Sequence, residues 1–302
     1  MDQPHAAAAG QDEGPVALTP QISVPGIERS RLTPSASQVC PTCGATTSSY
    51  VYAIGRIEPR FPLPSIEKEF AQTTGRADTA GLTDRQAIQK VLSQRSNRYL
   101  ARQLCWVMTI EGLENYILLP RDPLDVDLLI ESLRPTPTPL DLDVAIGMKG
   151  PVAATDVCNG LVVPILFFDQ LYSFDRDSLI KGIPRPEQMQ PEAFTAAAAE
   201  LFDRIMQMAD NAGATDNHRA LNYLAVRYPA IYAKAAENFA ANSSLSSLSV
   251  TPSSLSGARK ILDVIFSFTN RSTDVIEKFF CRVDITDEFP FLITKLSSYY
   301  DR

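Results

Sequence analysis

Histidine and tryptophan are the scarcest residues in this sequence, with two histidines and one tryptophan among 302 residues. His5 lies in an N-terminal stretch that we expect to be disordered, so His218 is the one imidazole available to a folded active site. Any Ser-His-Asp or Cys-His mechanism would therefore have to use His218. We expect an ordinary surface or interdomain histidine there, with a general base beside Asp216 as the alternative.

Glycine-rich motifs and long apolar runs are missing as well. The sequence contains neither GxGxxG nor GxxxxGK followed by Ser or Thr, so a dinucleotide site or a P-loop phosphate site is unsupported. A membrane helix needs about 18 consecutive apolar residues, and the longest candidate here, residues 161–168, has the length of a strand. The N-terminus lacks the basic and apolar regions of a signal peptide, so we expect a cytoplasmic protein.

The charge balance narrows the choice of partners. Lys and Arg total 28 against 35 Asp and Glu, which gives a formal net charge of −7. Nucleic acids and anionic membranes are bound by basic faces, so neither is an expected partner. The 45% hydrophobic and 21% charged residues are ordinary values for a globular protein.

Composition divides the chain into three parts. Residues 1–38 are rich in Ala, Pro, Gly, Ser and Gln, a composition that favours a disordered tail. Residues 39–185 are expected to form a sheet-rich α+β subdomain that begins at the CxxC motif. A proline-rich break at residues 183–186 then separates them from a second subdomain, residues 186–302, which begins as helices and ends as a β-hairpin.

The apolar patterns predict an α+β fold of two subdomains, in which helices pack against antiparallel sheets. In the first half we expect strands at 48–57, 104–110, 116–119, 143–149 and 161–169, and helices at 65–73, 83–95 and 122–134. In the second half we expect helices at 192–210, 221–228 and 230–240, strands at 261–269, 275–285 and 291–295, and a loop or weak strand at 243–256.

Three local patterns make these expectations specific. Thr83 followed by Gln86 matches a capping box that opens a helix, and Asp122 before Pro123 matches an N-cap. Residues 111–115 are expected to connect a β-hairpin. Pro164 cannot donate a backbone hydrogen bond, so its strand is expected at an edge or at a bulge.

A zinc knuckle is the sharpest chemical motif. Cys40 and Cys43, followed by Gly44, have the CxxC spacing of half a structural zinc site. Two more ligands are needed, and Cys158 and Cys105 are the expected ones, because Cys158 lies in a turn-like sequence and few other thiols remain. In reserve are Cys281 and His218.

Other roles for these cysteines are less favoured. Cys105 and Cys281 lie in apolar segments, where the alternative to a ligand is a buried thiol. A redox CxxC motif normally follows a strand and opens a helix, a context that is missing here. A disulfide framework is disfavoured by five cysteines in a long chain without a signal peptide.

Several longer strings resemble one known family more specifically than any motif above. They are residues 52–62, 67–70, 97–100, 103–106, 109–114, 158–161, 210–216, 219–229, 288–291, 294–297 and 299–302. Together they resemble the C-terminal region of the cyanobactin (patellamide-type) maturation proteases, the PatG family, over roughly residues 40–302. In that family the region is a domain of unknown function that follows a subtilisin-like protease. Nothing here corresponds to the protease part, so the resemblance implies no catalytic residues.

The expected function is therefore a non-catalytic binding or scaffolding protein in a pathway that matures ribosomal peptides. The resemblance implies a precursor peptide or a maturation enzyme as the partner. Peptides often add a strand to a sheet edge, which needs no special side chains, and the aromatic-rich second half offers either core packing or a peptide groove. A homodimer is also compatible with small sheet-edged domains. The alternative is an enzyme that uses a metal ion or acid–base chemistry at His218.

Overall fold

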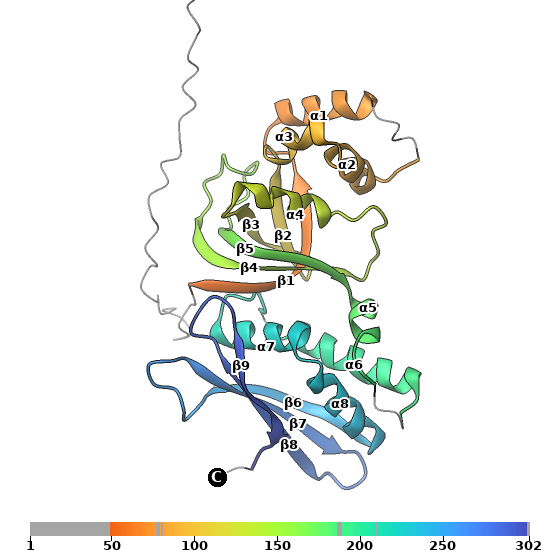
Figure 1. Cartoon of the computed structure of the whole chain (residues 1–302), viewed down its shortest axis with the longest axis vertical. Coiled ribbons are helices and arrows are strands. Elements are labelled where there is room, and N and C mark those ends of the chain that lie inside the picture. Colours follow the sequence, from red (N-terminus) through yellow and green to blue (C-terminus); the bar gives the residue numbers. More distant parts are fainter. Residues whose placement is uncertain (1–48, 77–78, 80, 186–188, 209, 301–302) are drawn as a thin grey trace, which may run out of the picture. The chain divides into compact units, whose positions relative to one another are not determined.

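The computed structural model describes residues 49–76, 79, 81–185, 189–208 and 210–300 (Figure 1). The predicted N-terminal tail, as well as Cys40 and Cys43, lies outside the described residues. Within them the protein is α+β, as predicted: strands form a barrel in the first half and an open sheet in the second. No helix in the described ranges is both long and apolar enough to cross a bilayer.

Five strands of the first half close into a barrel. They are β1 (Tyr50–Arg60), β2 (Cys105–Ile110), β3 (Leu113–Pro120), β4 (Asp141–Val152) and β5 (Pro164–Asp175). Around the barrel the order is β1-β2-β3-β5-β4, and every neighbouring pair is antiparallel except β3 and β5. The antiparallel character was predicted; the parallel closing pair was not.

One local prediction in the barrel is wrong, and another is confirmed in one of its two alternatives. The β2–β3 connection is two residues rather than five, because Glu111 and Gly112 both take positive φ values, 49° and 82°. That backbone is the one a tight hairpin turn requires. β5 is not an edge strand, since it pairs with β3 on one side and β4 on the other. The register between β4 and β5 shifts between Lys149 and Val152, next to Pro164, so the predicted bulge is present. As the first residue of β5, Pro164 is where a strand tolerates a missing N–H.

Short helices precede or follow the barrel strands, and α1–α4 cover the barrel core. They are α1 (Pro64–Arg76), α2 (Asp84–Leu92), α3 (Arg98–Ala101), α4 (Val126–Glu131) and α5 (Arg176–Lys181), with 3-10 turns at Arg95–Asn97 and Pro123–Asp125. The predicted capping box is confirmed, because Thr83 and Gln86 cap each other at the start of α2. Inward side chains such as Trp106, Met108 and Phe168 form one buried core with apolar residues of α1–α4.

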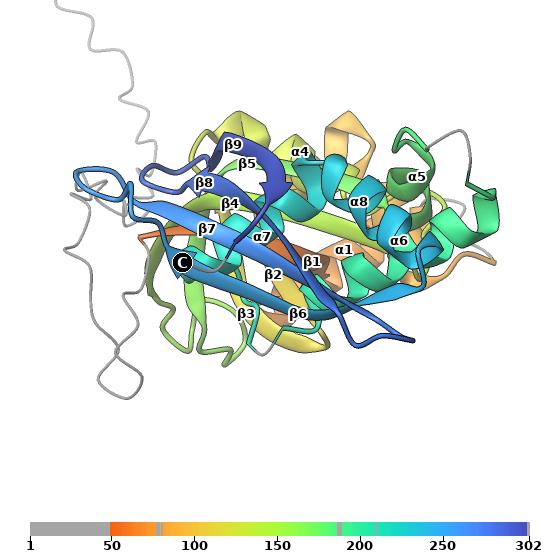
Figure 2. The same cartoon turned by 90° about the horizontal axis from the view of Figure 1, so that it is seen from below.

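The second half is a helical layer on a four-stranded sheet (Figure 2). The helices are α6 (Pro191–Met206), α7 (Asp216–Arg227) and α8 (Ala230–Ala240). The strands β6 (Ser243–Pro252), β7 (Ile261–Asn270), β8 (Ile276–Asp284) and β9 (Phe291–Ser298) pair antiparallel in that order. The serine-rich segment left open as a loop or weak strand is thus an edge strand, whose Leu245 and Leu248 face the helices.

Buried polar groups join α7 to the barrel. The Asn222 side chain donates to the Tyr52 carbonyl at 2.7 Å, and the Tyr52 N–H donates to the Gly213 carbonyl at 3.0 Å. Asn211 and Asn222 also exchange hydrogen bonds. A Cβ at Gly213 would lie 2.2 Å from the Tyr52 carbonyl oxygen, and its φ is +72°, so only glycine permits this approach. This junction fixes the helical layer against β1.

Candidate functional site

A cleft of about 390 Å³ opens beside one end of the barrel. Its walls come from four parts of the chain: β1, the β2–β3 turn, the segment leading into β4, and the facing ends of α5 and α6. That volume lies within the range of small-ligand and peptide side-chain pockets. The lining residues are Ile54, Gly55, Arg56, Glu58, Thr109, Glu111, Gly112, Pro139, Leu140, Leu142, Arg176, Phe202, Asp203 and Met206.

β1 forms one wall of this cleft at the point where its backbone hydrogen bonds pass from one neighbouring strand to another. Residues up to Gly55 pair with β4, and residues from Arg56 onward pair with β2. Gly55 is the last residue of β1 that pairs with β4. A Cβ there would lie 2.4 Å from the Thr109 carbonyl oxygen, so this position requires glycine. Ile57 of β1 no longer pairs with β4, and its N–H donates instead to the buried Asp143 carboxylate at 2.8 Å.

Asp143 is a structural carboxylate behind this wall. Besides the Ile57 N–H, it accepts a hydrogen bond from the Ser173 hydroxyl. Burial raises the pKa of Asp143 to about 6, against the opposing effect of these two hydrogen bonds. Its exposed fraction is 3%, so it is closed off from any ligand in the cleft.

The floor of the cleft is apolar and its rim carries charges of both signs. Ile54 and Phe202 are buried, and Leu142 and Met206 pack against the same core. On the rim, the exposed Arg56 guanidinium donates to the Pro139 carbonyl. Arg176 pairs with Asp203 at 3.1 Å, and Glu58 and Glu111 are exposed. Such a cleft suits a ligand with an apolar body and polar groups around it.

The ionisable groups of the lining are carboxylates and guanidinium groups. Among the described residues that form the cleft, Thr109 has the sole hydroxyl, and none is a histidine, cysteine or serine. Nucleophilic catalysis needs a nucleophile within reach of a base. The described residues that line the cleft therefore contain no pair of a nucleophile and a histidine base.

A second charged group lies where the β8–β9 loop meets the barrel. Arg121, after β3, pairs with Asp169 of β5 at 2.6 Å and with Glu288 of the loop at 3.6 Å. Burial raises the pKa of Glu288 to about 7, and its hydrogen bond and charge repulsion with Asp169 act in the same direction. Arg121 and Arg219 oppose that shift. The two carboxyl groups thus share the neighbourhood of one guanidinium.

His218 lies in the first turn of α7, where its N–H donates to the Thr215 hydroxyl at 3.1 Å. Burial lowers its pKa, and the charge of Asp210 opposes that change. Its Nδ1 has no hydrogen-bond partner among the described residues. Among the described residues, no hydrogen bond therefore orients the ring through Nδ1.

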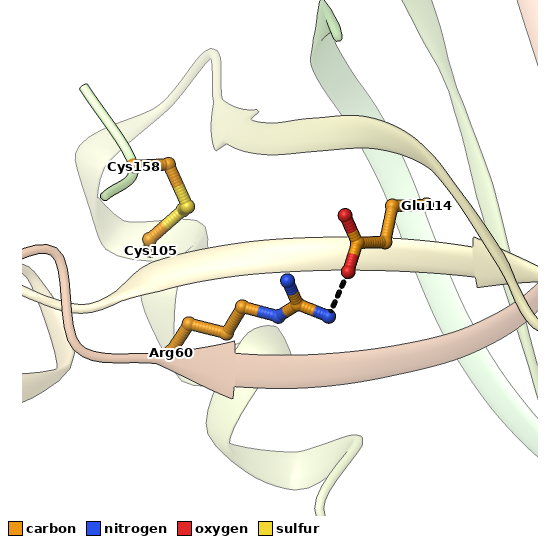
Figure 3. The surroundings of a disulfide bond; sticks show 4 residues. All are labelled: Arg60, Cys105, Glu114 and Cys158. Carbon is orange, nitrogen blue, oxygen red and sulfur yellow. Dashed lines mark ion pairs between the residues drawn. A yellow bond between two sulfur atoms is a disulfide. The ribbon is translucent and has the colours of Figure 1, made fainter. Parts of the chain in front are cut away.

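The predicted cysteine ligands have different surroundings. Cys105 and Cys158 form a disulfide (Figure 3), a role that the sequence disfavoured. Cys281 is a buried thiol on β8, and burial raises its pKa to about 12. Cys40 and Cys43 lie outside the described residues, so the zinc site stays a prediction. No group of three or more His, Cys, Asp and Glu side chains in the described ranges is arranged to hold a metal ion.

Sequence reasoning missed the cleft, although two of the strings that carry the family resemblance line it. These are Ile54–Glu58 in β1 and Thr109–Gly112 at the hairpin turn. A signal was present, because a glycine inside a strand often marks a close backbone approach. What the sequence does not indicate is that α6, nearly 100 residues further on, completes the cleft.

Residues 188–299 match the family model "PatG C-terminal". A solved structure described as "PatG Domain of Unknown Function" has the same fold, with a TM-score of 0.67 and 19% sequence identity. The similarity covers 83% of this chain and 99% of that one. No curated protein matches the chain. The resemblance to the PatG C-terminal region is thereby confirmed, and the matched stretch includes Phe202, Asp203 and Met206 of the cleft.

Proposed function

We propose that this chain is a non-catalytic binding module that holds a segment of an extended peptide in the cleft beside the barrel. Its resemblance to the PatG C-terminal region supports a place in the maturation of ribosomal peptides. The chain would then present a precursor peptide to separate modifying enzymes.

The observation that carries the proposal is the combination of an apolar floor with a rim of both charges. Phe202 and Leu142 supply a surface for one apolar side chain, and Arg56 and Glu111 lie on the rim around it. An extended peptide offers the same alternation, with side chains pointing to opposite sides and polar backbone groups between them. A preformed cleft of this kind can bind a peptide without catalytic side chains.

A peptide selection tests the proposal. The full chain is immobilised and used to select from a library of short linear peptides, and the affinities of the selected peptides are measured by fluorescence anisotropy. We expect Arg56→Glu and Glu111→Lys each to weaken binding by about tenfold, the typical worth of one charge-assisted hydrogen bond. Lys295→Glu, on β9 outside the cleft lining, is the matched control and should bind normally. Equal affinity for all variants, or no enriched peptide, overturns the proposal.

An acid–base enzyme is the second candidate, and Asp169 with Glu288 is the observation that favours it. Two carboxyl groups of which one keeps its proton near neutral pH recur in acid–base sites. Mass spectrometry of a selected peptide after incubation with the chain separates the candidates. A change of peptide mass that Glu288→Gln abolishes would favour the enzyme; an unchanged mass favours the binding module.

A further inference from the structure

The open sheet of the second half has two edge strands, β6 and β9, whereas the barrel of the first half is closed. An edge strand presents a row of backbone N–H and C=O groups along one side, and such a row can pair with a strand of another chain. Proteins block that pairing with charged side chains, prolines and bulges. The two edges of this sheet differ in how far they are blocked.

β9 is blocked in three ways. It carries Lys295, and its register with β8 shifts twice within eight residues. The Leu296 N–H donates to the Tyr228 hydroxyl at 2.8 Å, so this group is already bonded within the chain. β9 thus offers a further strand no regular row of backbone groups.

β6 lies along the opposite edge of the sheet and has less protection (Figure 2). Ser243–Pro252 contains no charged side chain. The register with β7 shifts once, between Leu245 and Ser247, and is unbroken beyond that point. On the side of the sheet away from the helices, β6 exposes only hydroxyl side chains over this part, those of Ser247, Ser249 and Thr251. The middle of β6 is therefore a regular, uncharged edge.

The hydrogen bonds between β6 and β7 show which backbone groups of β6 are left over. In an antiparallel pair, residues that exchange backbone hydrogen bonds alternate with residues that do not. The Ser253 N–H donates to the Ile261 carbonyl at 2.9 Å, and the same register continues back along β6. Every second residue from Ser253 backward therefore bonds to β7. The residues between them, including Leu248 and Val250, point their N–H and C=O groups out from the edge.

Leu248 and Val250 are the two residues that a further strand would meet. Within the described ranges, no other group bonds to the backbone of either residue; the Arg204 guanidinium donates to β6 before the register shift, at the Leu245 carbonyl. Their side chains lie on the helical side of the sheet, where they are half-buried against the core. A strand beside β6 would satisfy four backbone groups and cover both side chains.

A second copy of β6 fits this edge. When the two strands run antiparallel with Leu248 opposite Val250 of the other copy, they form four hydrogen bonds around a two-fold axis at Ser249. Apolar side chains then meet on the helical side, and hydroxyl groups meet on the outer side. A strand that pairs with its own copy brings identical charges together, which destabilises the pair. β6 has no charge to bring.

We propose that two copies of this chain associate through β6 and form one antiparallel sheet of eight strands. The interface is isologous, because each copy contributes the same strand. Pairing occupies β6 in both copies and leaves the blocked β9 at both outer edges, so assembly stops at the dimer and does not continue as a fibre. The described residues that line the cleft beside the barrel include none of β6, so the dimer is independent of the proposed peptide binding.

The oligomeric state of the full chain tests the proposal. Sedimentation equilibrium over a range of concentrations should give a mass that rises from one chain to two and no further. Ser249→Lys places two like charges at the axis and should weaken the association by at least about tenfold. Ser297→Lys, the same change on β9, is the matched control and should associate like the parent. A single-chain mass at every concentration, a mass above two chains, or a Ser249→Lys chain that associates like the parent overturns the proposal.

Two further variants test the register of the pairing. Val250→Pro removes an N–H that points to the free edge and not to β7, so the chain should keep its circular dichroism spectrum while the association weakens. Ser249→Cys places two thiols opposite each other at the axis, at a separation that a disulfide can span. On mild oxidation it should give a covalent dimer in which mass spectrometry finds residue 249 linked to its own copy. Ser297→Cys is the control and should not link. A folded Val250→Pro chain that associates like the parent, or a Ser249→Cys chain that links no more than the control, contradicts the proposal.

Discussion

Arg219 and Arg56 are the same residue type in two regions that use it in opposite ways. Arg219, only 1% exposed, lies at the junction between α7 and the β8–β9 loop, where it donates to the carbonyls of Ile285 at 2.8 Å and Glu288 at 3.2 Å. Arg56 is exposed on the rim of the cleft and donates to one carbonyl. The buried Arg219 thus holds α7 and the β8–β9 loop together. The exposed Arg56 makes one hydrogen bond within the protein and faces solvent at the cleft rim.

The largest expected effect comes from the junction. Arg219→Ala should lower the free energy of unfolding by about 4 kcal/mol, because several buried carbonyls lose their donor. Arg56→Ala should change it by less than about 0.5 kcal/mol. Urea denaturation followed by circular dichroism measures both. Similar losses for the two variants would break the comparison.

The disulfide should rank next. The double variant Cys105→Ser with Cys158→Ser should unfold about 3 kcal/mol more easily than the oxidised parent, since the bond closes a long loop in the unfolded chain. Zinc-free reduced parent protein should match the variant in the same denaturation experiment. A parent whose stability does not change on reduction would show that the apolar contacts and backbone hydrogen bonds of residues 153–163 hold this loop without the disulfide.

The buried Asp143 should make the free energy of unfolding depend on pH. Its pKa is raised from 3.8 to about 6 in the folded protein, so folding takes up a proton between these values. The stabilisation is complete below about pH 4 and is lost as the pH rises through about 6, a change of about 3 kcal/mol. Asp143→Asn cannot titrate and should lack this slope. Parallel pH–stability curves for parent and variant would contradict the assignment.

Glu288 should give the smallest effect. Its pKa is raised to about 7, so the parent should again lose stability as the pH rises, here between about pH 5 and about pH 8. Because the group is partly solvated, the change should be about 1 kcal/mol. Glu288→Gln should be flatter over that range in thermal denaturation. A parent that gains stability relative to Glu288→Gln as the pH rises would refute this.

Local signals in the sequence predicted local structure well. The capping box at Thr83 and the alternation of apolar residues are short-range patterns, and the structure contains both the helix and the strands they indicate. The hairpin connection was predicted three residues too long, at residues 111–115 instead of Glu111-Gly112, because positive φ at a non-glycine residue has no strong signature.

Long-range features could not be predicted in the same way. The parallel pairing of β3 with β5, the Cys105–Cys158 bond and the cleft all depend on segments that meet only after the barrel closes. Gly55 and Gly213 show why: each is required by the backbone of a distant segment, at Thr109 and Tyr52 respectively. A single sequence contains the glycine but not the carbonyl that would collide with a larger residue.

The double pairing of β1 has a consequence for how the chain folds. β1 is the first strand of the barrel to be synthesised, yet its partners β2 and β4 begin at Cys105 and Asp141. Contacts between such distant segments must overcome a large loss of chain entropy before they form, which slows folding. β1 therefore waits, with its apolar residues uncovered, until roughly ninety further residues have been made, and this interval is when the nascent chain is most prone to aggregate.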